Sequence, residues 1–339
     1  MDHKLMRVAV IGQVYPEASA RYLSKWFRQL GHEAEIFVAP STFGISRFRP
    51  DLINRVLERS IRLTLELSTS ASMRAEKRMA GKVLEWSPDL VVTFDAHLWP
   101  DTVRILRAQG AKVVLWFLDA LVNFGRQIMF LAPYDQIFLK DPYMVRYCSK
   151  VASLPARFLP EACDPEVHRP IEPAPAELIS DVAMIGNIHP SRVRLLEQLL
   201  DFDVKIWGRL WPRWLESPVE AKHMGRFLAG DEKAMAMRCS KAVLNNLHYG
   251  EIESSNCRMF EAAGCGAFQL AEWRPGFDEL FRDGEEIVYY RSAGELRDLL
   301  EFWLERDEER RAVGDAARAR AHTEHTFERR IEKLLEVTF

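Results

Sequence analysis

Short apolar runs, rich in β-branched residues, alternate with longer stretches of helical period along the first half of the chain. The runs that predict strands are residues 7–11, 34–38, 90–94, 112–117 and 136–139. Helical segments separate them, the longest from about residue 50 to residue 86. Continuous apolar strands joined by helices are typical of a parallel sheet that helices cover on both faces. The first half therefore predicts an α/β domain.

The same alternation restarts in the second half. Strands are predicted at residues 182–185, 204–207, 243–247, 267–270 and 287–290. Helices are predicted at residues 190–200, 257–264 and 277–281, and from residue 292 onward with one break near Gly314. Between the halves, residues 159–175 contain five prolines, which interrupt helix and strand alike.

This pattern predicts two Rossmann-like domains that face a central cleft, where open α/β sheets bind ligands at the carboxyl ends of their strands. The length of 339 residues agrees with two domains. We expect an N-terminal domain at residues 1–160, a proline-rich linker at 161–178 and a C-terminal domain at 179–325. For the final helix at 326–339, packing back on the first domain and mediating a dimer are the two alternatives.

Charge and composition narrow the class of protein. The chain has 46 basic and 49 acidic residues and a net charge of −3, so no global field attracts nucleic acid or anionic lipid. The N-terminus lacks the apolar region of a secretory signal, and the longest apolar run, residues 113–118, is far shorter than the ~18 residues of a membrane span. We expect a cytoplasmic protein without a membrane span.

Cysteine and histidine spacing predicts no metal site. The five cysteines form no CxxC pair and the nine histidines no HxxxH pair, so reduced thiols are expected and neither a disulfide framework nor bound zinc. The GxGxxG and GxxxxGK[ST] motifs are absent as well. A dinucleotide cofactor and a P-loop are therefore not expected.

The most informative stretch is EIESSNCRMFEAAGCGAFQLAE, residues 251–272. Glu253 and Glu261 are separated by seven residues, a spacing that lets both carboxylates point to one ligand from a loop and the helix after it. A carboxylate suits a ribose diol because it accepts two hydroxyl hydrogen bonds. Ser254, Ser255 or Asn256 is expected to cap the helix, whose free N–H groups and Arg258 would face a diphosphate.

Here the sequence resembles a known family. The Glu-x7-Glu element with its Ala-rich helix and Cys-Gly-Ala turn is similar to the donor site of GT-B glycosyltransferases. The pattern NxRxFEAxGCGAF, residues 256–268, resembles the branch named after a bacterial spore maturation protein. The resemblance extends over most of the chain and includes the segments WFLD, LPEACDPEVHRP, IGNIHPSR, IWG and LERDEERR.

The resemblance implies a nucleotide-diphosphate-sugar as co-substrate, held by the C-terminal domain, and an acceptor held mainly by the N-terminal domain. Glu261 would bind the ribose, and Glu253 would lie near the sugar or the diphosphate. Arg258 and Asn256 would contact the phosphates. The segment 223–231 occupies the place of the base-binding loop, where Arg226 and Phe227 would contact a nucleobase or, equally, form an ordinary connection with a buried Phe.

A second phosphate-binding segment is GNIHPSR, residues 186–192, between a predicted strand and helix. Gly186 allows close approach of the backbone to a phosphate, Asn187 follows it, and Arg192 supplies positive charge. The alternative is a plain turn with a solvated Arg192.

For the chemical step, helix dipoles and arginines can stabilise a leaving diphosphate, so we expect no metal requirement. An inverting enzyme also needs a general base. Asp95, His97 and Asp119 follow two predicted strands and are candidates, although helix capping is an equal alternative for the two aspartates. Residues 12–15 are expected to form an acceptor-side loop.

Alternative functions remain at this stage. A nucleotide-sugar epimerase of the same architecture would turn over its substrate without an acceptor, and a non-catalytic nucleotide-sugar-binding protein would lack the base. The sequence leaves the sugar, the nucleotide, retention or inversion, and a possible homodimer undecided. It also leaves open whether the acceptor is a glycan, a lipid-linked glycan, a small molecule or a protein.

Overall fold

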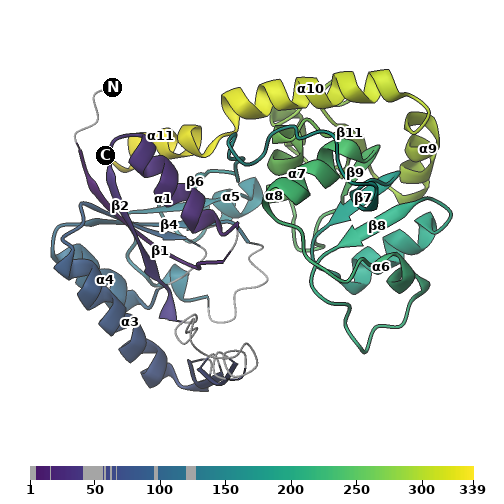
Figure 1. Ribbon diagram of the computed structural model, residues 1–339. Coiled ribbons are helices and arrows are strands. Elements are labelled where there is room, and N and C mark those ends of the chain that lie inside the picture. The colour runs from purple at the N-terminus through teal and green to yellow at the C-terminus, as the bar shows by residue number, and fades with distance from the viewer. Residues whose placement is uncertain are drawn as a thin grey trace. The chain divides into compact units, whose positions relative to one another are not determined.

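The computed structural model describes residues 5–15, 17–40, 56, 59–61, 63–65, 67–94, 98–119 and 127–339 (Figure 1). The chain divides into two compact units. The first unit contains Met1–Leu159 together with Arg330–Phe339, and the second contains Pro160–Arg329. Each unit is built around its own parallel sheet.

The first unit has a six-stranded sheet in the order β2-β1-β3-β4-β5-β6, and every neighbouring pair is parallel. The strands are β1 (Arg7–Gly12), β2 (Glu33–Val38), β3 (Leu90–Phe94), β4 (Lys112–Phe117), β5 (Gln136–Leu139) and β6 (Ala156–Phe158). The central strands β3 and β4 are apolar along nearly their whole length because both of their faces are buried.

Helices cover this sheet on both faces. The described helices are α1 (Ser19–Gln29), α3 (Thr69–Glu85), α4 (Pro100–Ala108), η3 (Ile128–Phe130) and α5 (Pro142–Lys150). Met79 and Val83 of α3 and Val103 of α4 share one apolar core with the strands. Helix α1 packs on the opposite face with Leu23 and Phe27 (Figure 1).

The second unit has a five-stranded parallel sheet in the order β11-β10-β9-β7-β8. Its strands are β7 (Val182–Ile185), β8 (Val204–Trp207), β9 (Ala242–Asn245), β10 (Gln269–Glu272) and β11 (Val288–Tyr290). Its helices are η4 (Ala176–Leu178), α6 (Pro190–Leu196), η5 (Glu197–Leu199), η6 (Pro218–Lys222), α7 (Gly230–Cys239), α8 (Cys257–Gly264), η7 (Phe277–Glu279), α9 (Ala293–Trp303) and α10 (Asp307–Glu324). Helices α6 and α9 share a core on one face, and α7, α8 and α10 cover the other (Figure 1).

These two sheets confirm the predicted α/β class with two Rossmann-like domains. Strand positions agree to within a few residues, although β6 was not predicted. The predicted break near Gly314 is wrong, because α10 runs through it without interruption. A side chain at Gly314 would collide with the carbonyl group of Gly266, so this glycine allows close packing of the helix.

The proline-rich segment, residues 160–175, lies within the second unit. It is anchored there at both ends. The backbone of Cys163 forms an isolated β-bridge with that of Thr326. At the other end, the Glu172 carboxylate accepts a hydrogen bond from Arg238 Nε at 2.5 Å. The last helix is α11 (Phe327–Thr338), and its residues from Arg330 onward, with the terminal Phe339, belong to the first unit.

Candidate functional site

Polar side chains collect at the carboxyl ends of β7 and β9 in the second unit. β7 ends at Ile185 and is followed by Gly186, and β9 ends at Asn245 and is followed by Asn246. Ligands of open parallel sheets bind at this edge, because the strands end there and the following helices begin there. The site is therefore built around the loops that follow β7 and β9.

Two arginines meet around Gly186 in this site. Arg258, in the first turn of α8, donates from Nε to the carbonyl oxygen of Ile185 and from Nη1 to Asn245 Oδ1 at 3.0 Å. Arg192 of α6 donates from Nε to Asn246 Oδ1 at 2.6 Å. Gly186 has a φ of +149°, and a Cβ at this position would collide with the guanidinium of Arg258. The φ therefore favours glycine at this position, and a larger residue would displace the guanidinium of Arg258 from its present place.

The two guanidinium groups, of Arg192 and Arg258, form a buried arginine pair. Arg192 is 5% exposed and Arg258 is 9% exposed. In the described parts of the chain, no carboxylate oxygen lies within 4.0 Å of either guanidinium. Burial and then the charge of Arg258 lower the pKa of Arg192 to about 9, and burial lowers the pKa of Arg258. An anion bound here would relieve the repulsion between the two cations.

The start of α8 adds hydrogen-bonding groups. Asn256 caps the helix, because its Oδ1 accepts from Met259 N at 3.2 Å while its Nδ2 donates to Asn245 Oδ1 at 2.8 Å. Asn245 Nδ2, Ser255 Oγ and Tyr290 Oη are buried and have no hydrogen-bond partner in the part of the chain that the structure describes. These three groups are therefore free to bond to a polar ligand or to water.

A buried ion pair lies one turn further along α8. Glu261 is 8% exposed, and its Oε2 lies 2.9 Å from Lys233 Nζ of α7. His168 Nε2, from the proline-rich segment, is 3.8 Å from Glu261 Oε1. Burial alone would raise the pKa of Glu261, but the interactions with Lys233 and His168 outweigh it and hold the pKa below its ordinary value. The carboxylate therefore remains ionised and can accept hydrogen bonds.

The comparisons with known proteins point to one class of enzyme. Residues 192–336 match the family model described as glycosyl transferase-like. No curated protein matches the chain.

Solved structures match the chain along nearly its whole length. Sucrose-phosphate synthase from Thermosynechococcus elongatus has 13% identity and a TM-score of 0.69, with 98% of each chain covered. HepE from Anabaena, in complex with UDP and glucose, has 12% identity and a TM-score of 0.65, with 98% of this chain and 99% of HepE covered. The trehalose-6-phosphate synthase OtsA has 11% identity and a TM-score of 0.67, with 98% of each chain covered. At these identities the solved structures establish the fold alone, and the enzyme class rests on the family match over residues 192–336.

The chain is a glycosyltransferase with the GT-B fold. The predicted resemblance is thereby confirmed, and the epimerase alternative is not favoured. The description as a member of the spore-maturation branch stays a prediction.

The structure brings together most of the donor-site residues predicted for this glycosyltransferase. Gly186, Arg192, Asn256 and Arg258 lie on the loops and first helical turns at the carboxyl edge of the second sheet, and Glu261 lies one turn further along α8. Contrary to the alternative of a solvated side chain, Arg192 is buried. The ligand roles of these residues stay predictions.

The remaining predicted donor residues lie nearer the surface. Asn187 is exposed, and its carbonyl oxygen accepts from Arg192. Glu253 is half-buried in the loop before α8. Phe227 is 50% exposed, which differs from the alternative of a buried Phe, and its neighbour Arg226 pairs with Glu232 at 2.7 Å. An exposed ring next to α7 is available for stacking.

Of the three candidate bases, Asp95 and His97 lie outside the described residues. Asp119 follows β4 in the first unit and is exposed. In the predicted acceptor-side loop, Val14 and Tyr15 are exposed. The catalytic assignments stay predictions.

Sequence reasoning missed four polar residues of the site: Lys233, His168, Asn245 and Asn246. The two asparagines had a recognisable signal, since two adjacent amides directly after an apolar strand mark its carboxyl end. Lys233 and His168 had none, because each meets Glu261 only through tertiary contact.

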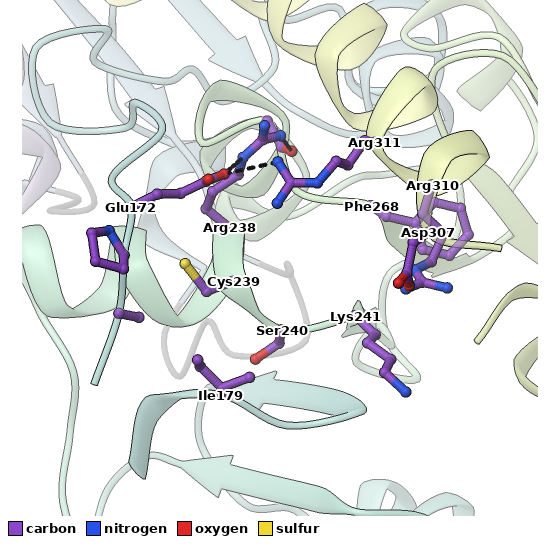
Figure 2. A pocket seen from close by; sticks show the side chains of 13 residues that line it. Glu172, Ile179, Arg238, Cys239, Ser240, Lys241, Phe268, Asp307, Arg310 and Arg311 are labelled. Carbon is purple, nitrogen blue, oxygen red and sulfur yellow. Dashed lines mark hydrogen bonds and ion pairs between the residues drawn. The ribbon is translucent and has the colours of Figure 1, made fainter. Parts of the chain in front are cut away.

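A cavity of about 600 Å³ lies elsewhere in the second unit (Figure 2). Its walls include Ser240 and Lys241, which precede β9, and Phe268, which precedes β10. It is therefore at the amino ends of these strands. Figure 2 shows Glu172 bonded to Arg238 and Arg311, with distances of 2.5 and 3.2 Å. Since its arginines are already paired, this cavity offers no free charge to a diphosphate.

Two further features bear on the predicted chemistry. Within the described residues, no three His, Cys, Asp or Glu side chains are grouped so that they could hold a metal ion. None of the described helices is long and apolar enough to cross a membrane.

Proposed function

We propose that the second unit binds a nucleotide-diphosphate-sugar and that the enzyme transfers the sugar to an acceptor hydroxyl without a metal ion. The observation that carries this proposal is the buried arginine pair, Arg192 and Arg258, which has no carboxylate partner among the described residues. HepE, which has the same fold, binds UDP-glucose in one solved structure and UDP with glucose in another.

The diphosphate would lie against the arginine pair and the start of α8. Arg258 is in the first turn of α8, and the first backbone N–H groups of a helix have no partner within the helix itself. Two guanidinium groups and these N–H groups match the negative charge of a diphosphate. Asn256 keeps the helix start in place through its cap.

The nucleoside would extend from the diphosphate toward α7. Glu261 presents an ionised carboxylate for the ribose hydroxyls, and Phe227 presents a half-exposed ring to the base. Both belong to segments at the carboxyl edge of the sheet, since Phe227 precedes α7 and Glu261 is in α8. Glu253, in the loop before α8, would face the sugar.

In the chemical step, the acceptor oxygen forms a bond to the anomeric carbon, and the bond from that carbon to the diphosphate oxygen breaks. The diphosphate leaves with the electron pair, and the arginine pair stabilises its negative charge. The hydroxyl proton passes to a base, for which Asp95, His97 and Asp119 are the candidates. Because two cations already neutralise the leaving group, a metal ion is not needed for that purpose.

The test measures binding of UDP, GDP, ADP and TDP by thermal shift and titration calorimetry. We expect at least one nucleoside diphosphate to bind to the wild type. Arg258→Met should lower the affinity by about 10- to 100-fold, because it removes one hydrogen bond between charged groups. Affinity for the corresponding nucleoside should change much less.

Arg238→Met is the matched control. Arg238 is also a largely covered arginine of the second unit, with a side chain 10% exposed, but it lines the cavity at the amino ends of the strands. Equal losses in both variants would mean that Arg258 acts only through folding. Glu261→Ala should reduce the thermal shift as well.

Transfer activity should persist in EDTA. Complete loss of activity in EDTA, with recovery on adding Mg²⁺ or Mn²⁺, would contradict a metal-independent step.

A further inference from the structure

Glu261 has close side-chain neighbours on two elements that are distant in sequence. Lys233 belongs to α7 and contacts Oε2 at 2.9 Å, and His168 belongs to the proline-rich segment and faces Oε1 at 3.8 Å. Both partners are buried, Lys233 at 6% and His168 at 2% exposure. Each oxygen of the carboxylate therefore has a fixed cationic or polar neighbour.

The histidine ring has a defined orientation. Its Nδ1 accepts from the backbone N–H of Asp164 at 2.9 Å, so the proton of the neutral ring is on Nε2, the atom that faces Glu261. The carbonyl oxygen of His168 lies 2.9 Å from Nε2 of His322 in α10. These contacts hold the proline-rich segment and turn the histidine toward α8.

Close packing of the segment on α8 depends on Gly264. A Cβ at this position would lie 2.9 Å from the carbonyl oxygen of His168 and 3.0 Å from its Cβ. Any side chain there would push the segment away from the helix. Because Glu261 is on the same helix, the glycine sets the distance between the histidine and the carboxylate.

The geometry leaves the carboxylate able to bind a diol. Two carboxylate oxygens offer about four lone-pair positions in total. Lys233 uses one of them on Oε2 and His168 approaches one on Oε1, so each oxygen keeps a position for a further hydroxyl. Two adjacent hydroxyls of one ring would fill these two positions.

We propose that Lys233 and His168 are positioning residues that hold the Glu261 carboxylate so that its two oxygens accept the 2′- and 3′-hydroxyls of a ribonucleoside diphosphate. The proposal rests on the proposed function. It adds that the enzyme discriminates ribose from 2′-deoxyribose and that this discrimination depends on the lysine and the histidine.

The charges around Glu261 give the proposal a pH signature. Lys233 from α7, His168 from the proline-rich segment and Arg258 from α8 all act on the carboxylate, and Cys257 and Glu161 lie in the same group of interacting side chains. Without Lys233, the burial of Glu261 would raise its pKa. A protonated carboxyl would then bind the diol less well as the pH falls.

The experiment compares the dissociation constants of each ribonucleoside diphosphate (UDP, GDP and ADP) and its 2′-deoxy form by titration calorimetry at pH 6 and pH 8. For the nucleotide that the wild type binds, we expect the 2′-deoxy form to have a dissociation constant about tenfold higher than the ribose form. This is the effect of losing one hydrogen bond to a charged group. In Lys233→Met, the ratio of the two dissociation constants should be near 1 at pH 6. At pH 8, where more of the carboxyl is ionised, the ratio should lie between 1 and the wild-type value.

Conservative variants are the controls. Lys233→Arg should keep the tenfold ratio, and His168→Gln, which retains a donor, should keep more of it than His168→Leu. Circular dichroism checks that each protein is folded. If Lys233→Met does not fold, Lys233→Gln is a second variant that removes the charge.

The outcomes separate the proposal from the function beneath it. A wild type that binds none of the diphosphates would overturn the proposed function. If the wild type binds one of them with a ratio near 1, the diphosphate site is supported, but Glu261 does not bind the ribose hydroxyls. If Lys233→Met weakens both forms equally, or leaves the ratio unchanged at both pH values, the lysine has only a structural role.

Discussion

Glu76 offers a sharp test of the electrostatics in the first unit. This residue of α3 is buried, and its Oε2 accepts from the backbone N–H of Trp99, at the start of α4, at 2.8 Å. Burial raises its pKa from 4.5 to about 7, although the Trp99 hydrogen bond acts in the opposite direction. The contact fixes the chain directly after the segment that carries Asp95 and His97.

The magnitude follows from linkage between protonation and folding. The folded protein holds the Glu76 proton up to about pH 7, while the unfolded chain releases it near pH 4.5. The contribution to stability is therefore complete below pH 4.5 and is lost as the pH rises to about 7. Since one pKa unit corresponds to about 1.4 kcal/mol, the free energy of unfolding should fall by about 3 kcal/mol over this range.

The variant Glu76→Gln keeps a carbonyl oxygen for the Trp99 N–H and removes the titration. Its stability relative to wild type should rise by about 2 to 3 kcal/mol between pH 5 and pH 8. The assay is urea denaturation at several pH values, with hydrogen exchange of the Trp99 amide as a local measure. Glu85→Gln, an exposed carboxylate on the same helix, is the control. Parallel curves for wild type and Glu76→Gln across this range would refute the reasoning.

Two glycine substitutions test the close contacts. Gly186→Ala should abolish detectable nucleoside diphosphate binding, because the new methyl group displaces Arg258 and the φ of +149° is unfavourable for alanine; unchanged affinity by calorimetry would show that the arginine pair does not need this glycine. Gly314→Ala should lower the free energy of unfolding by about 1 to 3 kcal/mol, since its Cβ overlaps the carbonyl group of Gly266; an increase in melting temperature would mean that α10 shifts without cost.

The sequence predicted the fold better than it predicted the site. Alternating apolar runs such as residues 90–94 are local signals, so both parallel sheets were expected from them. The predicted break near Gly314 was wrong. A glycine normally weakens a helix, but here it is needed because α10 lies close to the backbone of Gly266.

The donor-site motif was visible because Asn256, Arg258 and Glu261 are close in sequence. The partners of Glu261 were not, since Lys233 and His168 approach it only after α7 and the proline-rich segment have packed on α8. The burial of two neighbouring arginines is likewise a tertiary property, which no local pattern records.

The composition of the first unit from two separate stretches of chain has a practical consequence for dissecting the enzyme. The second unit is one uninterrupted stretch and is suited to expression as a fragment, whereas a fragment that stops at Leu159 lacks Arg330–Phe339. Ile331, Leu334 and Leu335 of that stretch are buried, so its removal would leave apolar surface open to water and favour aggregation. An isolated first unit should therefore be made with the final helix rejoined through a short linker or added as a peptide.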